Sequence, residues 1–156
     1  MSKLYYKWFG ISAVVVALDL YTKHLIQQSF NLGDFKKITP FFDLVRAHNT
    51  GAAFSFLADA GGWQKWFFTI VSMIAIVVLI VLIKKHQTNK LFCLGAALVL
   101  GGAIGNVFDR ITLGYVVDFL SFHINNHYWP AFNVADSAIV VGVGLLLIDG
   151  FKNPQT

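Results

Sequence analysis

Two aspartates of this sequence have surroundings that suit catalysis. Asp136 lies near the start of an apolar run, Phe132 to Gly150, where a carboxylate is costly and by default indicates a functional site. Asp118, in "GYVVDFLSF", likewise has no basic residue close to it in the sequence. Two carboxylates that share one site cannot both ionise cheaply, so one of them retains a proton. Such a pair can hydrolyse a peptide bond with neither metal nor cofactor, because one carboxylate activates water while the other donates a proton.

Two other functions remain open for the same aspartates. A small membrane transporter or proton-relay protein can pass protons along Asp118 and Asp136, and a non-catalytic membrane scaffold can use them as structural groups. Four short helices leave little room for alternating access, and the sequence has no inverted repeat, which a transporter of this kind is expected to show. The peptidase interpretation is therefore preferred, with the relay as its alternative.

Other charged residues are better explained as structural partners. Asp19 and Lys23 are spaced i, i+4, so their side chains face each other on a helix and can neutralise one another. The adjacent Asp109 and Arg110 are expected to form a second structural pair, with Asn106 within one helical turn of both. We expect these residues to lie at the depth of the two candidate catalytic aspartates.

The composition is that of a membrane protein with one domain. Of 156 residues, 56% are hydrophobic and 13% charged, and the mean hydropathy is +0.64; ordinary soluble domains have about 25% charged residues. The eight acidic residues are all aspartates, which excludes the HExxH metalloprotease motif. The basic residues are scattered at the edges of apolar runs. We therefore expect them to contact membrane lipids, and we expect no nucleic-acid partner.

Four apolar segments predict an all-α integral membrane protein, with a single peptidase domain over residues 1–156. Each segment is close to the roughly 18–20 residues that a helix needs to cross a bilayer. Gly and Pro turns between short apolar stretches predict a small β-rich platform between the first and second helices, and "DAGGWQKWFF" suggests a short interfacial helix. The predicted helices are about 8–26, 66–83, 91–108 and 133–150, and the longer connections are about 27–65 and 109–132.

Basic residues set the expected orientation. Positive charge is densest on the side that carries both termini and the 84–90 turn, and short loops rich in lysine stay in the cytoplasm. The two longer connections then face outward, and Asp136 lies about one turn below the outer surface. The lysines on the side of the termini are Lys3, Lys7, Lys84, Lys85, Lys90 and Lys152.

Two further patterns have ordinary explanations. His123 and His127 are spaced for a zinc site, but no third ligand is apparent, so a polar loop is expected there. Gly101 and Gly105 have GxxxG spacing, which suits close helix packing or a groove for an incoming helix.

Five motifs together resemble the bacterial lipoprotein signal peptidases, the signal peptidase II family. They span essentially the whole chain, in order and with compatible spacing. The motifs are "DLYTK" at 19–23, "NTGAAFS" at 49–55, "GGAIGNVFDR" at 101–110, "VVDF" at 116–119 and "FNVADS" at 132–137.

The resemblance implies an aspartyl endopeptidase of the bacterial cytoplasmic (inner) membrane, with four transmembrane helices and its active site near the outer leaflet. Family members cut prolipoproteins just before a cysteine that carries diacylglycerol, and the cyclic peptide globomycin inhibits them. By this resemblance, Asp118 and Asp136 are the catalytic pair, and Asp19 and Lys23 have an architectural role. Residues expected to support the site are Asn49, Gly51, Asn106, Arg110 and Asn133.

Overall fold

The computed structural model describes residues 4–51 and 62–153, and these contain four helices long and apolar enough to cross a membrane. The predicted membrane helices are therefore present, and each runs a few residues past the apolar segment that suggested it. Asparagine side chains mark where two of them begin, since Asn89 and Asn133 cap the helices that follow. The helices are α1 (Tyr5–Ser29), α2 (Trp63–Lys85), α3 (Lys90–Thr112) and α4 (Val134–Lys152).

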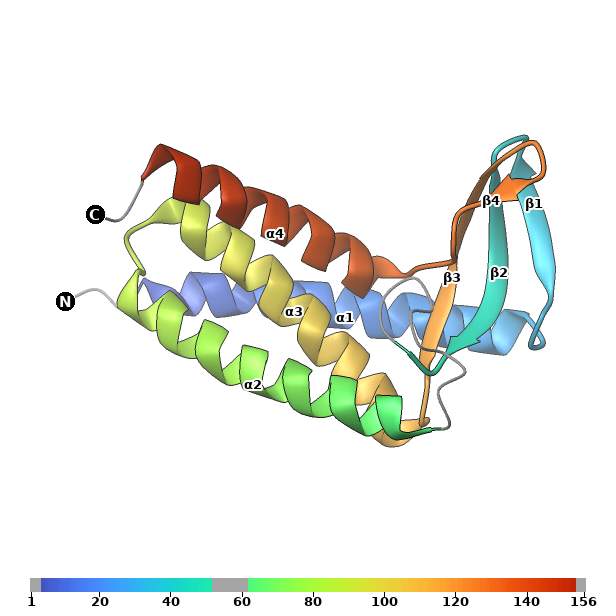
Figure 1. The fold of residues 1–156 in the computed structure, drawn as a ribbon, viewed down its shortest axis with the longest axis horizontal. Helices are drawn as coiled ribbons and strands as arrows, with labels where there is room; N and C mark the ends of the chain where they lie inside the picture. Colours follow the sequence, from blue (N-terminus) through green and yellow to red (C-terminus); the bar gives the residue numbers. More distant parts are fainter. Residues whose placement is uncertain (1–3, 52–61, 154–156) are drawn as a thin grey trace.

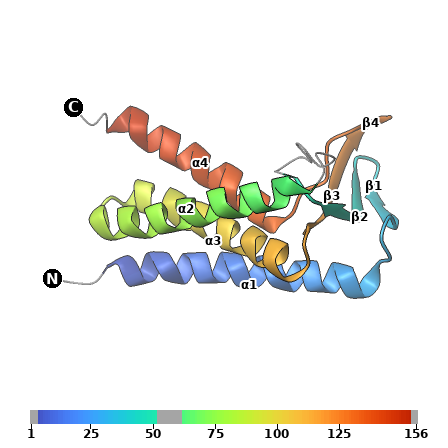
Figure 2. The ribbon, with the colours of Figure 1, turned by 60° about the horizontal axis from the view of Figure 1, so that its bottom comes forward.

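Helix α3 is the centre of the bundle and packs against each of the other three helices. Figure 2 shows α1 and α4 on opposite sides of the α2–α3 pair, diverging toward the termini and approaching each other toward the sheet. Most of α3 is buried, and many of its buried residues are glycine or alanine. Small side chains let helices approach closely where lipid, rather than water, surrounds the bundle.

The glycines of α3 are used for packing between helices. A Cβ atom at Gly101 would lie 2.8 Å from the carbonyl oxygen of Ser12 in α1, and one at Gly105 would collide with the carboxylate of Asp19. A Cβ atom at Gly95 would lie 2.8 Å from the carbonyl oxygen of Gly142 in α4. The GxxxG pair thus faces α1, which favours packing over an open groove for an incoming helix.

The small antiparallel sheet combines both long connections of the chain. Its strand order is β1-β2-β3-β4, and β2 pairs with β3 along most of its length. The prediction that placed the β-rich platform between the first two helices was therefore incomplete, because half of the strands follow α3. The strands are β1 (Phe35–Thr39), β2 (Phe42–Asn49), β3 (Val116–Ile124) and β4 (His127–Tyr128).

The prediction of a polar loop around His123 and His127 was wrong. Both residues belong to the β3–β4 hairpin, in which Ile124 pairs with His127 across two asparagines. Asn125 has a φ of 52°, and asparagine tolerates this left-handed conformation in tight hairpin turns. The turn chemistry, rather than the histidines, determines the structure of this segment.

The sheet and the two termini lie at opposite ends of the bundle (Figure 1). Residues 59–61 of the predicted interfacial helix lie outside the described residues, while Trp63 and Trp66 belong to the first turn of α2. The two tryptophans are therefore part of a membrane helix. Helices α2 and α4 both begin at the end of the bundle that carries the sheet (Figure 1). The first turns of these helices therefore lie close to the strands.

Candidate active site

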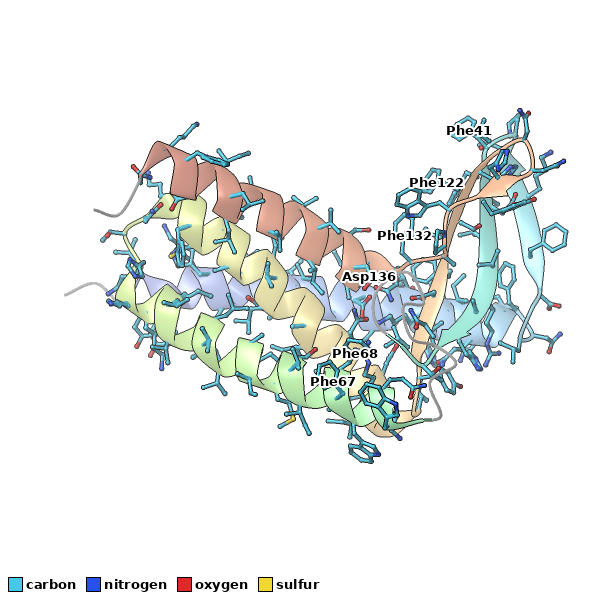
Figure 3. All side chains as sticks on the ribbon, in the orientation of Figure 1. Phe41, Phe67, Phe68, Phe122, Phe132 and Asp136 are labelled. Carbon is cyan, nitrogen blue, oxygen red and sulfur yellow. The ribbon has the colours of Figure 1, made fainter. Side chains whose placement is uncertain are left out.

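Asp136 lies in the first turn of α4, next to the sheet (Figure 3). Asn133 caps this helix, and its Oδ1 accepts a hydrogen bond of 2.8 Å from the backbone N–H of Asp136. Asparagine is a favoured capping residue because its short side chain satisfies an otherwise unpaired N–H group. A carboxylate in the first turn is also favoured by the helix dipole. The local sequence "NVAD" thus fixes where this acid lies.

Asp118 belongs to β3 and is almost fully buried, with 1% of its surface exposed. Its Oδ2 accepts a hydrogen bond of 2.9 Å from Nδ2 of Asn49, at the end of β2. Its Oδ1 accepts a hydrogen bond of 2.8 Å from Nδ2 of Asn133. Both oxygens are therefore held by neutral amides, contributed by a neighbouring strand and by the cap of α4.

Two asparagines connect the two aspartates. Asn106 in α3 donates from Nδ2 to Oδ1 of Asp136 at 2.8 Å, and its own Oδ1 lies 3.4 Å from Nδ2 of Asn133, the donor to Asp118. Burial, and then the nearby charge of Asp136, raise the pKa of Asp118 to about 7. The structure thus brings the two predicted catalytic residues into one electrostatically coupled site.

Lys23 is shared by a second group of carboxylates. Its Nζ lies 2.7 Å from Oδ2 of Asp19 and 3.1 Å from Oδ2 of Asp109, and it donates to Oδ1 of Asn106 at 3.0 Å. The predicted contact between Asp19 and Lys23 is present. The expected pairing of Asp109 with Arg110 is not, because adjacent residues on a helix point in different directions.

This group also holds the backbone beside each candidate catalytic residue. Oδ1 of Asp19 accepts a hydrogen bond of 2.8 Å from the N–H of Ala135, and Oδ2 of Asp109 accepts one of 3.1 Å from the N–H of Val117. Ala135 and Val117 directly precede Asp136 and Asp118 in the sequence. The lysine cluster therefore fixes the position of both chain segments that carry the aspartates.

Arg110 reaches toward the end of β2 instead. Its Nη2 donates to the carbonyl oxygen of Gly51 at 2.8 Å, and Nη1 donates to the carbonyl oxygen of Asn106 at 3.4 Å. The N–H of Gly51 in turn donates to Oδ1 of Asn49 at 2.9 Å. All five residues expected to support the site thus lie in one network with the two aspartates, whereas residues 52–55 of the "NTGAAFS" motif lie outside the described residues.

The family model and the curated relatives that match this chain agree on one family. A family model described as signal peptidase (SPase) II matches residues 11–152. The lipoprotein signal peptidases of Ralstonia nicotianae and of Janthinobacterium sp. are each 53% identical to this chain over 145 residues. The matched region covers 93% of this chain, 84% of the Ralstonia protein and 88% of the Janthinobacterium protein.

The chain belongs to the signal peptidase II family. Two solved structures described as bacterial membrane enzymes resemble it as well, with TM-scores of 0.85 and 0.81 and identities of 31% and 32%. They cover 96% and 94% of this chain, and 90% and 94% of their own chains are covered. The prediction of a lipoprotein signal peptidase, which is a hydrolase, is therefore confirmed. The prediction of a multi-pass bacterial membrane protein is confirmed as well. The transporter and scaffold alternatives lose their basis.

Two grooves of this signal peptidase share Asp136 in their lining, and Figure 3 shows Phe132 of one groove and Phe68 of the other on either side of that acid. One groove of about 350 Å³ lies along α4 and is lined by Trp129, Phe132 and Val140 as well as Asp136. The other, of about 240 Å³, lies between α2, α3 and α4. Its lining includes Phe68, Val71, Ala103, Asn106, Arg110 and Asp136.

Sequence reasoning gave no role to Phe68 or Phe132. The ring of Phe68 lies 6.0 Å from Cζ of Arg110, and the ring of Phe132 is stacked with that of Phe122 in β3 at 5.9 Å. Both are aromatic residues within an aromatic-rich chain, so composition does not single them out. Only their place beside Asp136 does.

Proposed function

We propose that the whole chain acts as one intramembrane aspartyl endopeptidase domain in which Asp118 and Asp136 hydrolyse the peptide bond. The supporting observation is that both acids are buried and are held by amides rather than by a cation, and that burial, and then the nearby charge of Asp136, raise the pKa of Asp118 to about 7. At neutral pH such a pair holds about one proton between its two members. An aspartyl peptidase requires this state.

The reaction needs one ionised and one protonated acid. Asp136 lines both grooves, so we assign it the ionised role: it takes a proton from a water molecule, whose oxygen adds to the scissile carbonyl carbon. Asp118 donates its proton to the carbonyl oxygen. When the C–N bond of the tetrahedral intermediate breaks, the leaving nitrogen takes a proton from Asp136, and the intermediate's hydroxyl returns a proton to Asp118. No metal or cofactor takes part in these steps.

The supporting residues keep this pair in its geometry. Asn49 and Asn133 hold the two oxygens of Asp118, and Asn106 holds one oxygen of Asp136. Arg110 fixes Gly51 beside Asn49, and so steadies the donor to Asp118. In this proposal the lysine cluster is structural and positions the backbone on which the two acids lie.

The proposed substrate is a prolipoprotein whose cysteine carries diacylglycerol, cut just before that cysteine. Two apolar grooves that meet at Asp136 support this choice, because the substrate has two apolar parts, a signal segment and a pair of acyl chains. A peptide mimic such as globomycin would occupy the same grooves and inhibit.

The proposed setting is the cytoplasmic membrane, with both termini in the cytoplasm and the site near the outer leaflet. The density of lysines at the end of the bundle that carries the termini supports this orientation. A labelling test of single cysteines introduced at two exposed positions, Asp34 directly before β1 and Lys85 at the end of α2, addresses it. Reaction of only the first with a membrane-impermeant reagent in intact cells is expected, and the reverse would overturn the orientation.

The decisive experiment replaces each acid by its nearly isosteric amide. Asp118→Asn and Asp136→Asn are compared with wild type in liposomes, using a diacylglyceryl-modified prolipoprotein and a gel shift. Each variant is expected to lose about 10²–10⁴-fold in cleavage rate, the size of a general acid–base contribution, while its melting temperature stays close to that of wild type. The matched control is Asp34→Asn, the same change at an exposed acid, which should leave the rate unchanged.

The possible outcomes test the role of the acid pair and the identity of the substrate separately. A folded variant that cleaves like wild type would remove its aspartate from the mechanism. The unmodified precursor, without diacylglycerol, is expected to be cleaved far more slowly by wild type. Equal cleavage of both precursors would overturn the assigned substrate but leave the acid pair in place.

A further inference from the structure

A polar groove lies at the end of the bundle opposite the sheet. Its volume is about 210 Å³, and it is formed where α2 ends, α3 begins and α4 ends. Leu82 and Leu146 lie on the membrane side of the groove, one turn before the polar residues of their helices. The polar lining consists of His86, Asn89, Asp149 and Asn153.

Asp149 is a buried carboxylate of this groove that has no ion-pair partner among the described residues. It is 6% exposed, and it accepts hydrogen bonds of 3.0 Å from Nδ2 of Asn89, to both oxygens, and from Nδ2 of Asn153. Within residues 4–51 and 62–153, no Lys, Arg or His nitrogen lies within ion-pair distance of it. Two amides leave acceptor capacity on a carboxylate that has about four lone-pair sites.

This arrangement differs from the other buried acids near a helix end. Asp19 and Asp109 have Lys23, and Asp118 shares its site with a second acid for catalysis. An isolated buried carboxylate is costly unless it is paired. Thirteen residues separate Asp149 from Asp136, or about 20 Å along the helix at 1.5 Å per residue, so this acid belongs to the other membrane surface.

Three lysines are direct sequence neighbours of residues that line the groove, and none of the three is itself a lining residue. Lys85 directly precedes His86, Lys90 directly follows Asn89, and Lys152 lies in the last turn of α4 beside Asn153. All three lysines are exposed and, in the part of the chain that the structure describes, none forms an ion pair. A negative interior within a positive rim complements a ligand that has an ammonium group next to a phosphate.

We propose that this groove binds the headgroup of phosphatidylethanolamine from the leaflet on the side of the termini. The ammonium group donates to Asp149 inside the groove, the phosphate lies among the rim lysines, and the acyl chains continue past Leu82 and Leu146 into the bilayer. Phosphatidylcholine has no N–H donor on its trimethylammonium group, and phosphatidylglycerol has no cation. The groove therefore selects a primary ammonium lipid.

Native mass spectrometry of the full chain released from detergent tests this selection. The protein is equilibrated with an equal mixture of phosphatidylethanolamine, phosphatidylcholine and phosphatidylglycerol that have identical acyl chains. The ethanolamine lipid is expected to be enriched about tenfold over the choline lipid, the value of one charge-assisted hydrogen bond. Asp149→Asn is expected to abolish that enrichment and to keep prolipoprotein cleavage, whereas the exposed control Asp34→Asn keeps both.

Additional experiments test the proposal even if the Asp149→Asn variant does not fold. The double change Lys90→Gln and Lys152→Gln alters exposed residues only and should weaken binding of all three phosphate lipids. Soluble O-phosphoethanolamine, the same chemistry without acyl chains, is expected not to displace the lipid at millimolar concentration; displacement would reassign the groove to a free metabolite. Equal retention of the three lipids by wild type would overturn the proposal and indicate only a general lipid contact.

Discussion

Two groups of buried carboxylates lie next to each other where the helices meet the sheet, and they are compensated differently. Asp19 and Asp109 share the ammonium group of Lys23, which lies within 3.1 Å of both. Asp118 and Asp136 are held instead by the amides of three asparagines. Among the described residues, the four acids of this region have two buried basic side chains, Lys23 and Arg110, and Arg110 makes its hydrogen bonds to backbone carbonyls.

The comparison shows that neighbouring buried acids of one protein are compensated in two ways, by a shared cation or by neutral amides. A nearby cation compensates the charge of a buried carboxylate directly, whereas the amides orient Asp118, whose pKa is raised by burial and then by the charge of Asp136. The first group also supports the second, since its carboxylates bind the N–H groups of Ala135 and Val117. Structural and chemical roles are thus separated between neighbouring side chains of the same type.

Removing the cation should damage the first group most. Lys23→Met keeps the length of the side chain but leaves Asp19 and Asp109 buried without a positive charge, and breaking a buried pair in this way costs about 3–5 kcal/mol. A large fall in the melting temperature in detergent is expected, with the exposed Lys36→Met as the matched control. Adding Asp19→Asn to Lys23→Met should recover part of the loss, because it removes one of the two unpaired charges. An unchanged melting temperature for Lys23→Met would show that the two groups do not differ in their need for a cation.

Changes at Asn133 should separate orientation of the second group from stability. Asn133→Ala removes both the cap of α4 and a donor to Asp118, so a loss of about 2 kcal/mol is expected from the cap and the broken hydrogen bond. Asn133→Ser restores a capping oxygen but not the amide donor. The serine variant is therefore expected to regain most of the melting temperature while its cleavage rate stays low. Equal recovery of rate and stability would show that the amide donor is dispensable.

The pH dependence should reveal the shared proton. The pKa of Asp118 is raised from 3.8 to about 7, so the folded protein binds this proton more tightly than the unfolded chain. The contribution of this group to the free energy of unfolding is therefore full below about pH 4 and is lost as the pH rises to about 7. Above pH 7 the pair loses its proton, and kcat/KM is expected to fall about tenfold per pH unit. A flat profile from pH 6 to 9, with a substrate that does not itself titrate there, would contradict a shared proton.

Much of this site could be read from the sequence because it depends on short spacings. Hydropathy indicated the four helices, since crossing a bilayer requires a continuous apolar segment of sufficient length. The i, i+4 spacing of Asp19 and Lys23 predicted their contact, which is present. The i, i+3 spacing of Asn133 and Asp136 placed both on one face of a helix, and there the asparagine caps the turn that carries the acid.

One expectation was incomplete and another was wrong for the opposite reason, since each depended on partners far away in the sequence. The platform was assigned to one connection because nothing local in β3 indicates that it pairs with β2. Asp109 was assigned to its neighbour Arg110, but a helix directs adjacent side chains apart, and the acid meets Lys23 of another helix.

The sequence by itself thus determined that this chain is a four-helix membrane protein of the signal peptidase II family with acids near the ends of its helices. Only the tertiary structure decided which acids receive a cation and which receive amides. Lys23 and Asn106 are 83 residues apart, and Asn49 and Asp118 are 69 apart. Such contacts follow from the packing of α3 against its neighbours and from strand pairing, for which a single sequence has no local period to read.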